Sequence, residues 1–176
     1  MPVVKNLGKV NMKRKIYDKL LQWKNEKDGT TALMIEGARR IGKSYIAERF
    51  AEKEYESYIL IDFSKAPARV RGWFDEYLED IDTLLQNIQL HYKKKLTPRK
   101  SLIIFDEVQK CPRAREAIKA LVEDHRFDYI ETGSLISIKK NVDDILIPSE
   151  EDGIEMYPMD FEEFMWAMGD EVMYPY

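Results

Sequence analysis

The feature that most constrains this chain is the octet GARRIGKS at residues 37–44, which fits the pattern G-x-x-x-x-G-K-[ST]. A short apolar segment at 31–36 precedes it, and a segment of helical period at 43–55 follows it. The two glycines let the backbone curl so that successive N–H groups point inward, and the following helix adds its positive N-terminal end. Strand, loop and helix in this order predict an α/β fold that binds a phosphate group.

The same alternation of strand and helix continues along the chain. Apolar segments rich in β-branched residues predict strands, and apolar residues three or four apart predict helices. The predicted strands are residues 31–36, 57–63, 101–106, 127–133 and 154–159, and the predicted helices are 12–24, 43–55, 73–92, 113–124 and 161–168. Residues 134–153 are expected to be irregular. Strands that are apolar on both faces and alternate with helices indicate a parallel sheet covered on both sides.

Composition places the chain among globular proteins. A length of 176 residues favours one domain, and 44% hydrophobic residues exclude a disordered or low-complexity chain. The net charge of −4 hides a gradient, because residues 1–50 are strongly basic and residues 141–176 carry 11 acidic and no basic side chains. One cysteine and no apolar run of membrane-spanning length predict a cytoplasmic protein without a membrane segment.

A second motif follows the octet. The apolar strand at 102–105 ends in Asp106 and Glu107, the Walker B arrangement. Asp106 is expected to hold Mg²⁺ through water, beside the hydroxyl of Ser44. Glu107 is placed to polarise a water molecule near the γ-phosphate. The chain has no Asn-Lys-x-Asp segment of the kind that reads guanine, which favours ATP over GTP.

A third motif, Thr132-Gly133-Ser134, ends the strand predicted at 127–133. A hydroxyl there can contact the γ-phosphate or the attacking water, and Ser134 is preferred over Thr132 for this role. The predicted catalytic residues are therefore Lys43, Glu107 and Ser134, and the predicted metal ligands are Ser44 and Asp106. The predicted nucleotide-binding residues are Gly37, Ala38, Arg39, Arg40, Ile41, Gly42, Lys43, Ser44 and Tyr45.

These motifs, together with the Cys-Pro-Arg-Ala stretch at 111–114 and the segment YPMDFEEF at 157–164, occur in the order of one family. The chain resembles the N-terminal AAA-type P-loop ATPase domain of the bacterial and archaeal family whose second half is a DUF4143 domain. The resemblance implies a three-layer fold with strand order 5-1-4-3-2, ATP as the nucleotide, and the roles of Lys43, Ser44, Asp106 and Glu107 given above.

The resemblance also implies a domain organisation. The whole chain, 1–176, is expected to be one ATPase domain with an N-terminal amphipathic helix at 12–24 and a nucleotide-binding core at 31–159. Residues 160–176 are expected to begin the connection to a C-terminal half that is absent from this chain. That half and further copies of the chain are the expected partners.

The predicted function is ATP binding with hydrolysis of the γ-phosphate. Two alternatives stay open: a small P-loop kinase, and a module in which ATP only controls binding to DNA or protein. Arg113 and Arg115 are candidates for arginine fingers acting between subunits, although solvated helix positions are the simpler interpretation. The basic cluster of Lys93, Lys94 and Lys95 is a candidate contact for nucleic acid, which the acidic total charge disfavours.

Overall fold

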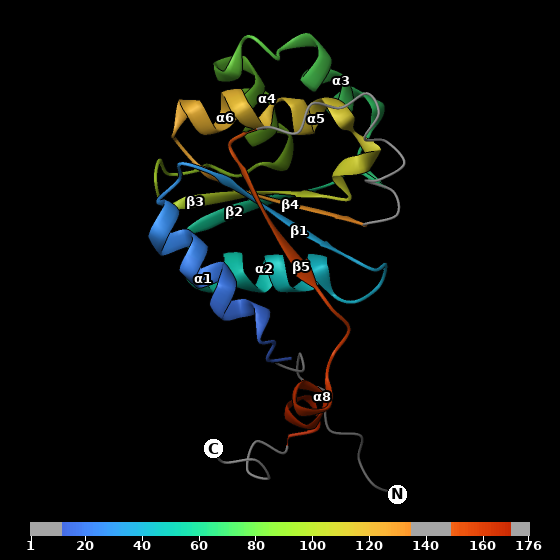
Figure 1. Ribbon diagram of the computed structural model, residues 1–176. Helices are drawn as coiled ribbons and strands as arrows, with labels where there is room; N and C mark the ends of the chain where they lie inside the picture. The colour runs from blue at the N-terminus through green and yellow to red at the C-terminus, as the bar shows by residue number, and fades with distance from the viewer. Residues whose placement is uncertain (1–11, 135–148, 170–176) are drawn as a thin grey trace, which may run out of the picture.

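The computed structural model describes residues 12–134 and 149–169, and its centre is a five-stranded sheet in the order β2-β3-β4-β1-β5 (Figure 1). Each neighbouring pair of strands is parallel. The strands are β1 (Ala32–Gly37), β2 (Ser57–Asp62), β3 (Ser101–Asp106), β4 (Asp128–Ser134) and β5 (Glu151–Met156). The sheet confirms the predicted order 5-1-4-3-2, read here from the opposite edge.

Helices cover both faces of this sheet and complete the three-layer fold (Figure 1). On one face lie α1 (Ile16–Lys27) and α2 (Lys43–Glu54). The other face carries α3 (Ala68–Glu76), α4 (Ile81–Tyr92), α5 (Pro112–Glu116) and α6 (Ile118–Asp124), and a 3₁₀ turn, η1 (Val108–Lys110), leads into α5. The last helix, α8 (Phe161–Ala167), follows β5 and lies beyond the end of the sheet. Within the described ranges no helix is long and apolar enough to cross a membrane.

The alternation of side chains along each strand divides the core into two apolar clusters. Ile103 and Phe105 of β3 pack on the side of α3 to α6, whereas Leu102 and Ile104 pack on the side of α1 and α2. Successive strand residues point to opposite faces, so Asp106 lies on the same face as Leu102 and Ile104. Its carboxylate therefore emerges on the face that α2 covers.

The helix predicted at 73–92 is two helices, α3 and α4, which corrects the prediction. Asp80 separates them: its side chain accepts a hydrogen bond from the Thr83 backbone N–H at 3.1 Å and caps α4. A cap of this kind satisfies one of the free donors of the first helical turn. The apolar period continues across the break because both helices cover the same face of the sheet.

Two other predicted helices have different bounds. The helix predicted at 12–24 is α1, Ile16–Lys27, because Arg14 leaves the helical path to make long-range contacts, and the helix ends at Asp28 with a left-handed backbone (φ 45°). The helix predicted at 113–124 divides into α5 and α6 at Ala117. Pro112 stands at the first turn of α5, where its missing N–H costs little.

The fifth strand begins earlier than predicted. Residues 151–153, predicted to be irregular, belong to β5 (Glu151–Met156), and the strand predicted at 154–159 ends at Met156, so that Pro158 lies beyond it. The acidic residues at the start of this strand are typical of an exposed loop. The side chain of Glu151 is nevertheless buried, and its carboxylate accepts two hydrogen bonds from the Arg115 guanidinium, at 2.7 and 3.1 Å. Residues 135–148 of that prediction, and 170–176 of the predicted connection, lie outside the described residues.

Beside this ion pair, Glu131 of β4 is fully buried. Among the described residues no donor hydrogen-bonds to either of its carboxylate oxygens. Burial, followed by the nearby charge of Glu151, raises the pKa of Glu131 well above its ordinary value, and Arg115 only partly opposes this. A protonated Glu131 can donate a hydrogen bond to the Glu151 carboxylate, so the fold favours the neutral acid.

This burial predicts a pH-dependent effect of Glu131→Gln on stability. The folded-state pKa of Glu131 lies above the unfolded one, so its contribution to stability is largest below about pH 4.5 and declines as pH rises toward the folded pKa. Across that window the wild type loses up to about 1.4 kcal/mol per pH unit through this group. Glu131→Gln should therefore be more stable than wild type at pH 8, with a gain that shrinks at acidic pH in urea unfolding. The exposed Glu123→Gln serves as the control, and an equal gain at all pH values would contradict the prediction.

Candidate nucleotide-binding site

The predicted phosphate loop connects the end of β1 to the start of α2. β1 ends at Gly37, and α2 begins at Lys43, so residues 38–42 form the turn. Two of its residues have left-handed backbone: Arg40 with φ 63° and Gly42 with φ 96°. Left-handed residues in a short turn reverse the direction of successive peptide groups, which is how backbone N–H groups come to face a common centre.

The two glycines of the motif are required for different physical reasons. At Gly37 a Cβ atom would lie 2.3 Å from the carbonyl oxygen of Met156, the last residue of β5, so there is no room for a side chain. At Gly42 a Cβ would meet only ordinary contacts, the nearest 3.6 Å away at Arg14. The left-handed φ of Gly42 is what disfavours other residues there.

Lys43 stands at the first position of α2 and is buried. Its ammonium group donates hydrogen bonds to the carbonyl oxygens of Gly37 and Ala38, at 3.2 and 2.6 Å, so it lies across the loop that precedes it. Burial lowers the pKa of Lys43, while the negative charges of Glu107 and Asp106 act in the opposite direction. The loop thus carries a cation at its centre, which suits an anionic ligand.

The hydroxyl of Ser44 meets the end of β3. Ser44 Oγ donates a hydrogen bond to Asp106 Oδ1 at 2.6 Å, and the hydroxyl of Thr132 on β4 hydrogen-bonds to the same oxygen. The Thr132 hydroxyl also accepts a hydrogen bond from the Glu107 backbone N–H at 3.1 Å. Three segments far apart in sequence are therefore joined at the carboxyl ends of β3 and β4 and the start of α2.

Glu107 follows Asp106 with a left-handed backbone, φ 55° and ψ 48°, which turns its side chain out of the strand direction. Its carboxylate accepts a hydrogen bond from the side-chain amide of Gln109 at 2.5 Å. The hydrogen bond from its N–H to Thr132 stabilises a conformation that L-residues seldom adopt. Thr132 and Gln109 therefore fix the backbone and the carboxylate of Glu107, respectively.

A pocket of about 290 Å³ lies beside the loop. Its walls combine the loop and α2 with the segments that precede α1 and follow β5, and apolar atoms dominate them. It is lined by Met12, Arg14, Arg40, Ile41, Gly42, Tyr45, Pro158 and Met159. Small-molecule sites in proteins are concave and mainly apolar with volumes from about 300 Å³ upward, so this pocket lies at the small end of their range.

The remaining predicted residues occupy varied positions. Ser134 ends β4 directly opposite Gly37 in the sheet register, so it lies next to the start of the loop. Arg39 is exposed at the tip of the loop. Of the candidate arginine fingers, Arg115 is buried in its ion pair with Glu151, which removes it from the surface, and Arg113 is exposed and paired with Asp75 and Glu116.

Sequence reasoning missed two residues of the site, Gln109 and Arg14. It preferred Ser134 to Thr132, and Thr132 is the hydroxyl that contacts Asp106 and Glu107. Strand phase does not separate the two, because residues two apart in a strand face the same side, here that of α2. Gln109 and Arg14 carried no motif, and only the folded chain brings them to Glu107 and to the loop.

The chain also matches a model of a known protein family. A family model described as an AAA domain matches residues 29–165, well over half of the chain. The chain belongs to this AAA domain family. Membership supports a nucleotide-binding P-loop ATPase fold and leaves the DUF4143-type second half as a prediction. Comparison with curated proteins gave no match.

Among solved structures, this AAA domain is similar to the one titled "Structure of C. elegans PCH-2", with 16% sequence identity and a TM-score of 0.43. The alignment covers 87% of this chain and 41% of that chain. The AAA domain therefore spans less than half the length of that protein.

The close approach of Gly37 to β5 predicts the effect of Gly37→Ala. The added Cβ must displace the backbone at Met156, so we expect a loss of about 1–3 kcal/mol in the free energy of unfolding. The matched control is Gly153→Ala on β5, where a Cβ meets nothing within 4 Å and the expected change is within about 0.5 kcal/mol. Denaturant unfolding of both variants measures the difference, and equal losses would refute the steric explanation.

Proposed function

We propose that this AAA domain binds ATP with Mg²⁺ and hydrolyses the γ-phosphate. The observation that carries the proposal is the hydrogen bond between Ser44 and Asp106, because it brings the hydroxyl of the phosphate loop to the carboxylate of Walker B. The buried Lys43 and the loop N–H groups would neutralise the phosphates. The apolar pocket that includes Ile41 and Tyr45 would accept the adenine ring.

The donor set fits Mg²⁺ as part of a nucleotide complex. In the part of the chain that the structure describes, no group of three or more His, Cys, Asp or Glu side chains is arranged to hold a metal ion. Mg²⁺ does not need such a cage, since it is commonly held by one or two protein oxygens together with phosphates and water. Ser44 and Asp106 would supply those oxygens, and the ion would neutralise charge on the β- and γ-phosphates when bound.

The proposed role of Glu107 is to orient the attacking water. Its backbone is held by Thr132 and its carboxylate by Gln109, so the side chain is positioned before a substrate binds. A carboxylate held by a single neutral amide keeps free acceptor positions for a water proton. Ser134, beside the start of the loop, remains our candidate for a second contact to the γ-phosphate or this water.

A kinase lid could draw on two arginine-bearing stretches of this chain, residues 69–71 and 113–115, and ion pairs engage the second of them. A small P-loop kinase would need arginines free to close over the phosphates. Arg115 is buried against Glu151, and Arg113 pairs with Asp75 and Glu116. The other alternative, ATP-gated binding without turnover, differs from our proposal only in the rate of phosphate release.

The proposal includes partners and location. Residues 149–169 carry acidic and no basic side chains, and Tyr157, Phe161, Phe164 and Met168 among them are largely exposed. The predicted DUF4143-type half is our candidate for the partner that covers these side chains, with further copies of the chain as a second. The single, buried cysteine, Cys111, is consistent with the reducing cytoplasm that we propose as its location.

Lys43→Ala tests nucleotide binding directly. Removing the cation should weaken ATP binding at least about 100-fold by calorimetry, because charge-assisted hydrogen bonds to phosphate are among the strongest that proteins make. The control is Lys53→Ala, an exposed lysine in the last turn of the same helix, which should leave the affinity unchanged. Equal affinities of wild type and Lys43→Ala would sink the assignment of the phosphate loop.

Glu107→Gln separates hydrolysis from binding. ATP affinity should change little, whereas phosphate release without any acceptor should fall at least about 100-fold, the usual contribution of a general base. Turnover by the chain alone is expected to be slow, so single-turnover measurements with excess protein are the appropriate assay, and Glu123→Gln is the control. ATP binding without phosphate release from wild type would favour the ATP-gated module, and transfer to an added nucleoside or nucleotide would favour the kinase.

A further inference from the structure

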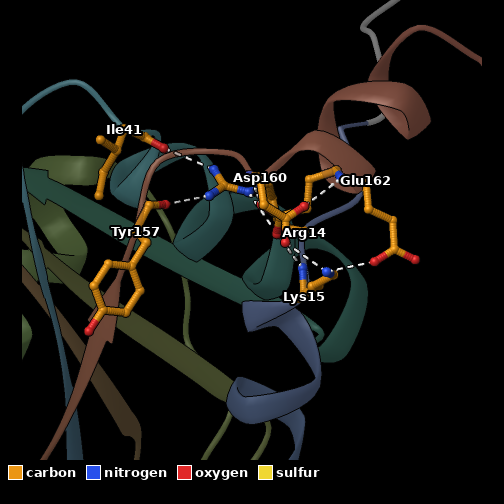
Figure 2. Close-up of polar contacts among 7 residues, drawn as sticks. Arg14, Lys15, Ile41, Tyr157, Asp160 and Glu162 are labelled. Atoms are coloured by element: carbon orange, nitrogen blue, oxygen red, sulfur yellow. Dashed lines mark hydrogen bonds and ion pairs between the residues drawn. The ribbon is translucent and has the colours of Figure 1, made fainter.

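Arg14 is a buried arginine that joins three separate parts of the chain (Figure 2). Its Nη1 donates to the carbonyl oxygen of Ile41 in the phosphate loop at 2.9 Å, and its Nη2 donates to the carbonyl oxygen of Tyr157, just after β5, at 2.7 Å. Its Nε lies 3.3 Å from Oε1 of Glu163 on α8. One guanidinium thus contacts the loop, the end of the sheet and the last helix.

Glu163 is itself fixed from several directions. Its Oε1 accepts the Lys15 backbone N–H at 2.8 Å, and its Oε2 accepts the Asp160 backbone N–H at 3.2 Å. Asp160 in turn accepts the Glu163 N–H at 2.9 Å, which completes a capping box at the start of α8. The position of Arg14 and the position of α8 are therefore determined together.

The contact with Ile41 acts on the shape of the phosphate loop. The Ile41 carbonyl and the Gly42 N–H belong to one planar trans peptide, so they point in opposite directions. By binding that carbonyl, Arg14 fixes the direction of the Gly42 N–H, away from itself. Ile41 lies between the two left-handed residues Arg40 and Gly42, where the backbone has the most freedom to change its direction.

We propose that Arg14 is a positioning residue of the nucleotide site and that the Arg14–Glu163 pair couples this site to α8. The proposal rests on the proposed function, since it requires a nucleotide at the phosphate loop. Arg14 holds the loop in its binding-competent shape only while Glu163 and the Tyr157 carbonyl hold Arg14. By thermodynamic reciprocity, a nucleotide that stabilises the loop also stabilises the docked position of α8.

The coupling gives α8 a use as a reporter of the nucleotide state. Phe161, Phe164 and Met168 occupy one face of this helix and are 65%, 51% and 71% exposed, whereas Glu163 on another face is buried. The DUF4143-type half proposed above, bound to the exposed face, would act on the same short helix that holds Glu163. Nucleotide binding and partner binding would therefore influence each other through Arg14.

The experiment compares two equally buried arginine–glutamate pairs. The side chains of Arg14 and Glu163 are 5% and 7% exposed, and those of Arg115 and Glu151 are 6% and 5% exposed. The ion pair of Arg115 joins it to Glu151 at the start of β5 and not to the phosphate loop, so Arg115 is the matched control. Arg14→Met should weaken ATP binding about tenfold or more by calorimetry, within the usual range of coupling between sites. Arg115→Met should lower the melting temperature and leave the ATP affinity within about twofold of wild type.

A second variant and a second readout keep the test decisive if Arg14→Met does not fold. Arg14→Lys retains the charge and the aliphatic stem but cannot reach both carbonyl oxygens and Glu163 at once, so a smaller loss of affinity is expected. Hydrogen exchange of α8 should slow when ATP binds to wild type, and this effect should be reduced in either Arg14 variant. Unchanged affinity and unchanged exchange in the Arg14 variants, or equal losses of affinity in Arg115→Met, would overturn the proposal. If wild type itself binds no ATP, the proposed function fails and this inference fails with it.

Discussion

The parallel pairing of β1 with β4 and β5 at the centre of the sheet is the constraint on which the rest of this structure depends. Parallel strands end at the same edge, so the pairing brings Gly37, Ser134 and Met156 into one row. The phosphate loop leaves this row next to β5, close enough to Met156 that only glycine fits at position 37. The ends of β3 and β4 then place Asp106 and Thr132 within reach of Ser44.

The loop is held at two points, by the last residue of β5 and by the residue that follows it. Gly37 packs against the Met156 carbonyl, and Ile41 is tied to the Tyr157 carbonyl through Arg14. Of the two left-handed residues in the loop, Gly42 is a glycine, whereas the backbone of Arg40 costs about 1–2 kcal/mol. The YPMDFEEF segment is therefore part of the structural support of the candidate site, although Tyr157, Phe161 and Phe164 are largely exposed.

Buried charge has two different consequences in this molecule. In the pairs Arg14–Glu163 and Arg115–Glu151 each buried charge lies against an opposite one, so neither is buried alone. Arg115 holds the start of β5, and Arg14 holds the start of α8. Among the described residues no donor hydrogen-bonds to Glu131, and its burial raises the pKa of its carboxyl group. Both arginines act far along the chain from their partners, a separation that local sequence patterns do not reveal.

The sequence by itself determined the class of fold and located the motif residues from Gly37 to Ser44 with Asp106 and Glu107, because these depend on local pattern and on the spacing of motifs along the chain. The strand order was implied by the resemblance to a known family, and the sheet confirms it. Tertiary structure decided where β5 begins, which hydroxyl of the Thr132-Gly133-Ser134 turn meets Asp106, and what Arg14 contacts. The physical reason is that these outcomes depend on pairing between residues distant in sequence. An acidic residue such as Glu151 is indistinguishable from a solvated loop residue until the arginine that neutralises it is brought against it.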